Sequence, residues 1–255
     1  MTDLMIERRE GVVEVTFNRP EKFNSFTRAM YTEMRELFLA TAQDTTVKAV
    51  VLRGAGGKAF AAGNDIADFL AQDQVSYEAE IRTMFDALAA LPQVTIAAVD
   101  GVCVGGGLGI ATFCDLRLAT AKSKFGYPIA RTLGNALSAP VLFRCAAIFG
   151  ESITREMLLA ARLVTAQRAY GLGALAEVVE DGDALTASVA ALVEEILLLS
   201  GVTRRTTKDQ LAFRAGTIEQ VPEGEEALLR EVYGGPDFAE GVRAFLAKEK
   251  PAFRG

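Results

Sequence analysis

One stretch of this chain, residues 99–115, constrains its fold more than any other. It reads Val-Asp-Gly-Val-Cys-Val-Gly-Gly-Gly-Leu-Gly-Ile-Ala-Thr-Phe-Cys-Asp, which predicts a short apolar strand that runs through a glycine turn into an apolar helix. Because glycine has no Cβ, Gly105, Gly106 and Gly107 allow another molecule to approach the main chain closely. The first N–H groups of the following helix have no partner within that helix. The turn therefore predicts one half of an oxyanion hole.

A second turn, in residues 58–68, repeats this arrangement about forty residues earlier. It reads Lys-Ala-Phe-Ala-Ala-Gly-Asn-Asp-Ile-Ala-Asp. We expect Phe60 to end a strand, Gly63 to make the turn and Asp65 to cap the next helix. Backbone N–H groups from two such turns can converge on one carbonyl oxygen.

Composition limits the classes of protein that remain. A chain of 255 residues that is half apolar can bury one sizeable core, so we expect one domain with a short appendage. The net charge of −6 argues against a nucleic-acid surface, and Arg204, Arg205 and Lys208 are interpreted as a solvated helix face. The N-terminus does not resemble a signal peptide, and no apolar run approaches the roughly 18 residues that span a bilayer. These features predict a cytoplasmic protein with no membrane or nucleic-acid partner.

The absence of histidine excludes several catalytic arrangements whatever the fold. It removes Ser-His-Asp and Cys-His catalysis and any imidazole base. The three cysteines, Cys103, Cys114 and Cys145, lie in apolar runs without metal-ligand spacing, so we expect reduced core residues and no metal site. The glycine runs lack the spacing of dinucleotide-binding and P-loop motifs. No cofactor is expected from these patterns.

Short apolar strands alternate with amphipathic helices along the first 200 residues, which predicts an α/β core over residues 1–200. From residue 201 to 255 strands disappear, and we expect a helical region of two helices bounded by Pro222 and Pro236. A mobile segment is expected after Asp65, leading to a helix through Ile81 and Phe85. The expected strands are 6–9, 12–17, 48–53, 95–99 and 175–179, and further helices are expected from Thr27 to about residue 44 and from near residues 138, 152 and 165.

The two glycine turns, in this order, resemble the signature of the crotonase (enoyl-CoA hydratase/isomerase) superfamily. The resemblance extends to residues 17–25 (Phe-Asn-Arg-Pro-Glu-Lys-Phe-Asn-Ser), to residues 113–119 (Phe-Cys-Asp-Leu-Arg-Leu-Ala) and to the tail at 238–253. It implies a crotonase-type spiral of ββα units with a C-terminal helical region that acts as a lid or in oligomerisation. It also implies a homotrimer or a dimer of trimers.

The same resemblance implies a site for an acyl-CoA ester, with coenzyme A present only as part of the substrate. The oxyanion hole would use the backbone N–H groups of Asn64 and Gly106. Phe245 and Lys248 would cover the adenine from a neighbouring subunit. The substrate-binding residues implied are Lys22, Phe23, Asn24, Ala61, Ala62, Asp65, Ile66 and Gly105.

The chain departs from the family pattern at both usual catalytic glutamates. The first position is Gly109 and the second is Ile129, and no carboxylate stands at the later position near Leu137 that some isomerases use. A replacement must be polar and must lie near the acyl end of the pocket, although each candidate also fits a surface or supporting role. The candidates are Tyr127, Arg131, Asn135 and Ser138, with Asp68 or Glu78 reaching in from the segment after the first turn.

Three functions stay open on this sequence. The first is an acyl-CoA enzyme of hydratase/isomerase type with an unusual acid or base. The second is a decarboxylase of a malonyl-type CoA, in which loss of the carboxylate removes the need for a base. The third is a binding protein that keeps the acyl-CoA groove without catalysis.

Overall fold

A β-hairpin opens the chain and forms one edge of the larger sheet. The computed structural model describes residues 2–71, 73–218 and 220–253, apart from the side chains of residues 74, 75, 217 and 218. Strands β1 (Leu4–Arg9) and β2 (Val12–Phe17) pair antiparallel around Gly11, whose φ of 73° lies in the region that glycine adopts without strain. The predicted hairpin is confirmed.

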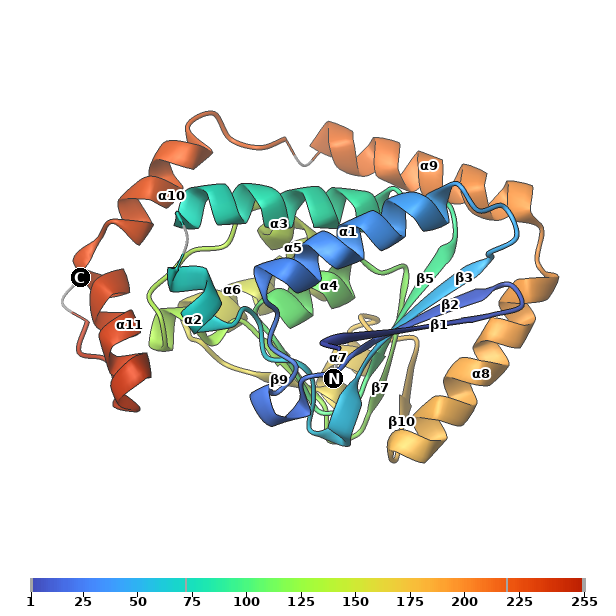
Figure 1. The fold of residues 1–255 in the computed structure, drawn as a ribbon, viewed down its shortest axis with the longest axis horizontal. Coiled ribbons are helices and arrows are strands. Elements are labelled where there is room, and N and C mark those ends of the chain that lie inside the picture. The colour runs from blue at the N-terminus through green and yellow to red at the C-terminus, as the bar shows by residue number, and fades with distance from the viewer. Residues whose placement is uncertain (1, 72, 219, 254–255) are drawn as a thin grey trace.

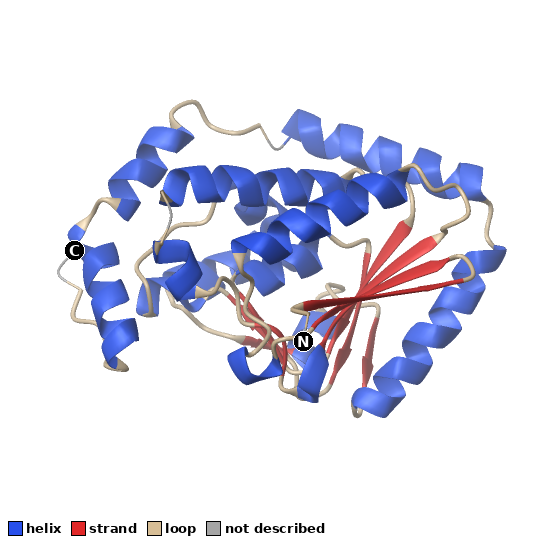
Figure 2. Ribbon diagram, viewed as in Figure 1, coloured by secondary structure: helices blue, strands red, loops and turns tan. Residues whose placement is uncertain are grey.

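The strands form two sheets (Figure 2). From β2 onward the strands of the six-stranded sheet are parallel, and each residue of β5 is buried, as expected for strands covered on both faces. The six-stranded sheet has the order β1, β2, β3 (Ala49–Gly54), β5 (Val94–Val99), β7 (Leu116–Thr120) and β10 (Glu177–Val179). The four-stranded sheet has the order β4 (Ala59–Ala61), β6 (Val102–Val104), β8 (Lys124–Gly126) and β9 (Val164–Thr165).

Helices cover both faces of the larger sheet (Figure 1). On one face, α1 and α3 pack side by side, and on the other α8 places Leu185 and Val189 against Val51 and Ile96. The helices before residue 200 are α1 (Arg28–Ala42), α2 (Ile66–Leu70), α3 (Gln74–Ala89), α4 (Gly106–Phe113), α5 (Ala139–Phe149), α6 (Glu151–Leu159), α7 (Ala166–Gly171) and α8 (Gly182–Leu198). Short 3₁₀ turns occupy Pro20–Lys22, Ala55–Gly57 and Pro128–Arg131.

The chain advances by a repeated strand-strand-helix unit, which confirms the predicted spiral. Strands β3, β5 and β7 enter the six-stranded sheet, whereas β4, β6 and β8 that follow them enter the smaller one. Since β4 and β6 are parallel neighbours, the turns at their carboxyl ends lie at the same edge of the sheet. This topology brings the two glycine turns together.

Helix α2 occupies the segment that was expected to be mobile. Asp65 caps it, and its carboxylate accepts hydrogen bonds from the N–H groups of Ala67 and Asp68 at 3.1 and 3.3 Å. Two satisfied N–H groups explain why this short segment is helical. Residue 72, also in the expected mobile segment, lies outside the described residues.

The described part of the C-terminal region holds three helices, α9 (Gly201–Ile218), α10 (Glu225–Tyr233) and α11 (Pro236–Ala247), where two were predicted. The extra helix arises because α9 begins directly after α8, upstream of Pro222. Figure 1 shows the three helices following the outside of the molecule, with α10 packed against α3. Among the described residues no single helix is long and apolar enough to cross a membrane, and α8 with α9, bent by 105°, meets that criterion only as a pair.

Asn24 supports the turn that precedes α1, and its removal should destabilise the fold. The buried side chain accepts from the Arg19 N–H at 3.0 Å and donates to the carbonyls of Ala55 and Ala59 at 2.9 and 2.7 Å. Asn24→Ala leaves these groups unpaired at a backbone φ of 55°, so we expect a loss of about 3 kcal/mol or more in the free energy of unfolding. Urea unfolding measures this loss.

The matched control is Asn18→Ala, because that side chain makes one exposed hydrogen bond, to the Thr2 carbonyl. We expect it to cost less than about 1 kcal/mol. Equal effects of the two substitutions would contradict the structural role of Asn24.

Candidate active site

The two glycine turns touch each other at the edge where β4 and β6 end. Gly63 and Gly105 have φ angles of 98° and 56°, which residues with a side chain rarely adopt. A Cβ on Gly63 would lie 3.3 Å from the Gly106 nitrogen and 3.5 Å from the Gly105 Cα. The close approach of the turns therefore depends on glycine at these positions.

Asn64 in the first turn and Gly106 in the second each have a backbone N–H group with no acceptor among the described residues. The backbone N–H of Phe26 donates to the Gly63 carbonyl, and the Phe26 carbonyl accepts from the Asp65 N–H. This bridge does not use the N–H of Asn64, which lies between them. Gly106 is the first residue of α4, where an N–H has no intrahelical acceptor. Among the hydrogen bonds of the described residues, neither of these N–H groups donates.

The side chains around the first turn are held in place by buried polar contacts. The Tyr31 hydroxyl donates to Asn64 Oδ1 at 2.6 Å, and burial raises the pKa of Tyr31 well above its usual value, so this donor stays protonated. Arg19 binds the Asp65 carboxylate at 2.8 Å. Burial raises the pKa of Asp65, but Arg19 and the capping N–H groups outweigh it, so the pKa lies below its usual value.

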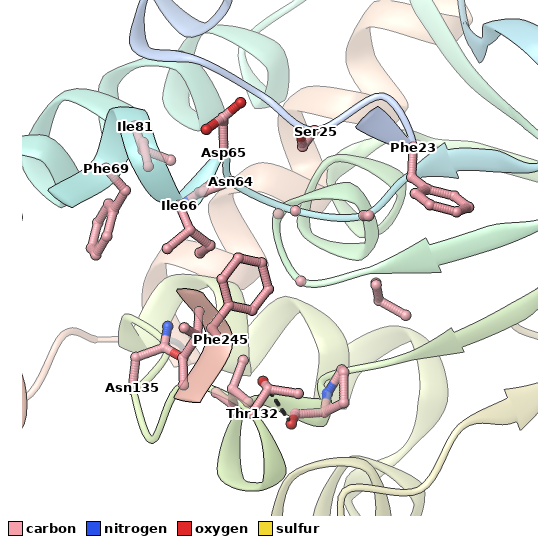
Figure 3. A pocket seen from close by; sticks show the side chains of 18 of the residues that line it. Phe23, Ser25, Asn64, Asp65, Ile66, Phe69, Ile81, Thr132, Asn135 and Phe245 are labelled. Carbon is pink, nitrogen blue, oxygen red and sulfur yellow. Dashed lines mark hydrogen bonds between the residues drawn. The ribbon is translucent and has the colours of Figure 1, made fainter. Parts of the chain in front are cut away.

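A cavity of about 870 Å³ opens beside the two turns. Its inner wall is apolar, with Phe69, Ile81 and Phe85 among the side chains that line it, and Figure 3 shows Ile66 and Phe245 among the other side chains of the wall. Eight of the predicted site residues with an implied substrate or oxyanion role lie in the wall, namely Lys22, Phe23, Ala62, Asn64, Asp65, Ile66, Gly105 and Gly106.

Asn24 and Ala61 were also predicted to bind substrate, but the structure places them outside the cavity wall. Both are fully buried. Asn24 uses its amide on backbone groups, as described above. Ala61 is the last residue of β4 and its carbonyl lies 2.3 Å from where a Cβ on Gly107 would be, so it packs beneath the second turn. Their side chains shape the turns that line the cavity.

At Gly109 an aromatic ring fills the space beside the backbone. A Cβ built on Gly109 would lie 2.9 Å from Phe85 Cζ, and the Phe85 ring packs against Phe113 at 4.7 Å between centroids. Ile129, at the second position where the resemblance implies a glutamate, lines the cavity with an apolar side chain. The structure thus adds apolar surface at both positions.

The polar candidates divide into two groups. Asn135 and Ser138 line the cavity. Tyr127 is fully buried in the core and Arg131 is exposed, and neither belongs to the cavity wall. Asp68 also lies outside this wall, where it accepts from the Arg28 N–H at 2.7 Å and from the Tyr77 hydroxyl at 3.2 Å. The described residues contain no group of three or more His, Cys, Asp or Glu side chains that could hold a metal ion.

Glu78 on α3 is the candidate that the structure places most informatively. It lines the cavity, and its Oε1 accepts a hydrogen bond from the Tyr233 hydroxyl of α10 at 2.9 Å. Burial raises the pKa of Glu78 to about 7, with the Tyr233 hydrogen bond opposing the shift and Glu225 adding to it. A sequence signal existed, because Glu78 stands three and seven residues before Ile81 and Phe85, on the apolar face of α3.

The C-terminal helices contribute to the cavity from within the same chain. Phe245 and Lys248, at the end of α11, line it beside residues of the first turn. The resemblance implied that these two side chains reach the site from a neighbouring subunit. The structure instead places them at the cavity of their own chain.

Comparison with known proteins agrees with this architecture. The model of the enoyl-CoA hydratase/isomerase family matches residues 7–255. A solved enoyl-CoA hydratase/carnithine racemase from Magnetospirillum magneticum is 35% identical, with a TM-score of 0.80 over 100% of this chain and 96% of the other. The 2,3-dehydroadipyl-CoA hydratase of Escherichia coli K12 is 29% identical over the whole of both chains. A solved methylmalonyl-CoA decarboxylase is 25% identical, with a TM-score of 0.88 over 100% and 98% of the two chains.

The spiral of strand-strand-helix units and the paired glycine turns define a crotonase-type protein. The chain belongs to the enoyl-CoA hydratase/isomerase family.

The contact between Gly109 and Phe85 predicts a coupling that unfolding experiments can measure. Gly109→Ala forces the Phe85 ring to shift, so we expect a loss of about 1–3 kcal/mol in the free energy of unfolding although alanine favours helix. In a Phe85→Leu background the same substitution meets a shorter side chain and should cost less, by about 1 kcal/mol. A double-mutant cycle in urea checks this, and additive losses would contradict the packing described.

Proposed function

We propose that this protein is an acyl-CoA enzyme of hydratase/isomerase type that stabilises a thioester enolate between the backbone N–H groups of Asn64 and Gly106. The observation that carries the proposal is the pair of unpartnered N–H groups on touching turns at the wall of an apolar cavity. A thioester oxygen gains negative charge when the neighbouring carbon loses a proton. Donors fixed before the reaction stabilise that charge more than the neutral carbonyl.

The lining of the cavity suits an extended acyl thioester whose polar end lies at the mouth. Phe69, Ile81 and Phe85 offer an apolar environment for the acyl chain. Lys22 and Lys248 are exposed at the mouth, where ammonium groups can meet phosphates of coenzyme A. The similar 2,3-dehydroadipyl-CoA hydratase of Escherichia coli supports the same class of substrate, because its name specifies a CoA ester.

Removal of the Gly106 N–H should lower turnover without breaking α4. Proline is tolerated at the first position of a helix, but any Cβ at Gly106 would lie 2.6 Å from the Tyr31 hydroxyl, so the comparison is made in Tyr31→Phe protein. There Gly106→Ala keeps the N–H and Gly106→Pro removes it. We expect the proline variant to have a kcat about 10²–10³ below that of the alanine variant.

The assay follows hydration of a 2-enoyl-CoA and isomerisation of a 3-enoyl-CoA, with the melting temperature of each variant measured alongside. Equal turnover of two folded variants would contradict the role of Gly106. Failure of the unmodified protein to bind any CoA thioester in calorimetry would overturn the proposal as a whole.

Decarboxylation of a malonyl-type thioester is the second candidate. It is favoured by the 25% identity and TM-score of 0.88 to the methylmalonyl-CoA decarboxylase, and by apolar surface at Gly109 and Ile129. Departure of carbon dioxide leaves the same enolate, so the N–H pair would serve this reaction too. Release of carbon dioxide from methylmalonyl-CoA, with no turnover of either enoyl-CoA, would select it.

A further inference from the structure

The cavity wall contains one carboxylate whose surroundings differ from those of the others. Glu21 is exposed near the mouth, and Asp65 is bound by Arg19 and caps α2. Glu78 instead shares the apolar face of α3 with Ile81 and Phe85. Among the described residues, its side chain accepts a hydrogen bond from the neutral hydroxyl of Tyr233 through Oε1, and the second carboxylate oxygen can meet a ligand in the cavity.

The hydroxyl that donates to Glu78 belongs to an aromatic cluster whose rings come from α2, α3, α10 and α11. The Tyr233 ring lies 5.7 Å from Phe69 of α2 and 5.1 Å from Phe238 of α11, measured between centroids. Phe69 in turn packs edge-on against Tyr77 of α3 at 5.0 Å. These contacts hold the Tyr233 ring in one position, and with it the hydrogen bond to Glu78.

We propose that Glu78 is the catalytic acid and base of this cavity, that Tyr233 positions it, and that it carries a proton between C2 and C4 of a 3-enoyl thioester. The Glu78 carboxylate takes the C2 proton, and the electron pair of the broken C–H bond forms the C1–C2 double bond of a dienolate. The negative charge moves to the thioester oxygen. Protonated Glu78 then returns the proton to C4, the carbonyl re-forms, and the double bond lies between C2 and C3.

The electrostatic surroundings suit a group that must both take and give a proton. Burial raises the pKa of Glu78 to about 7, so both of its forms are populated near neutral pH. Tyr233 and Glu225 face it from α10, and Tyr31 faces it from α1. Tyr77 precedes Glu78 on α3, and burial raises the pKa of Tyr31, Tyr77 and Tyr233, so their hydroxyls stay neutral. Glu225 is itself paired with Arg82 at 3.8 Å.

This assignment rests on the proposed enolate site but makes its own prediction. The probe is trans-3-hexenoyl-CoA in deuterium oxide, with exchange at C2 and formation of the 2-enoyl isomer followed by NMR and absorbance. We expect Glu78→Gln to lower both rates about 10²–10⁴-fold while the dissociation constant changes only a few-fold. Glu78→Asp should retain part of the rate. Glu80→Gln, on the same helix but paired with Arg28 at the surface, is the matched control and should keep the full rate.

The pH profile separates a positioning role of Tyr233 from a merely structural one. The Tyr233 hydrogen bond lowers the pKa of Glu78 and the Glu225 charge raises it. Tyr233→Phe should therefore move the acidic limb of kcat/KM to higher pH, and Glu225→Gln should move it to lower pH. Shifts in the same direction, or none, would overturn the assignment.

A stability measurement tests whether Glu78→Gln acts through the lost carboxylate or through misfolding. Because the folded-state pKa is raised, the folded protein binds more protons than the unfolded one between about pH 4.5 and 7, and ionisation lowers its stability over that range. The melting temperature of Glu78→Gln relative to the unmodified protein should rise through this window and level off above it. A difference that does not vary with pH would contradict the raised pKa.

The outcomes for the two proposals differ. If the unmodified protein binds the thioester and Glu78→Gln exchanges the C2 proton as fast as it does, the role of Glu78 is wrong and the enolate site stands. If the unmodified protein binds the thioester but neither exchanges the C2 proton nor forms the 2-enoyl isomer, the assignment of Glu78 as base is equally wrong. Absence of binding removes both proposals.

Discussion

The parallel pairing of β4 with β6 is the constraint on which the candidate site depends. It places residues 62–64 and 105–106 at one edge of the smaller sheet. The turns can then approach until a Cβ on Gly63 would be 3.3 Å from the Gly106 nitrogen. The interaction of an N–H dipole with an oxyanion weakens when the donor is displaced by even about 1 Å. Although these strands are short, their pairing fixes that separation more firmly than a free loop could.

Much of the fold could be predicted from the sequence because the signals are local. The hairpin around Gly11, the Thr27 cap of α1 and the strand into the glycine triplet each depend on residues a few positions apart, and each is present in the structure. The buried, unpaired cysteines follow from their apolar neighbours. The Asp65 cap was predicted and is present, whereas the five-residue helix after it is too short to show a clear periodicity.

The site was less predictable because its decisive contacts join distant residues. Tyr233 is 155 positions from Glu78, and the tail pattern gives no sign that its hydroxyl reaches α3. Asn24 was expected at the substrate, yet its amide donates to the carbonyls of Ala55 and Ala59, which lie 31 and 35 positions further along the chain. The ring of Phe85 beside Gly109 is likewise a tertiary contact. In each case the motif identifies the region, and packing decides what the side chain does there.

The apolar side chains at the inner end of the cavity link its two chemical features. A low-polarity wall strengthens the interaction of an N–H dipole with a nearby oxyanion, and it also disfavours the ionised form of a carboxyl group. The Phe85 ring beside Gly109 and the side chain of Ile129 add to that wall at the two positions where the family resemblance implies glutamates. Two carboxylates in one pocket would raise each other's pKa further. The pKa of one carboxyl group is therefore easier to hold near 7 when its neighbours are apolar. In the proposed reaction, the apolar surroundings of Gly109 and Ile129 therefore favour one proton carrier on α3 over a pair of acids.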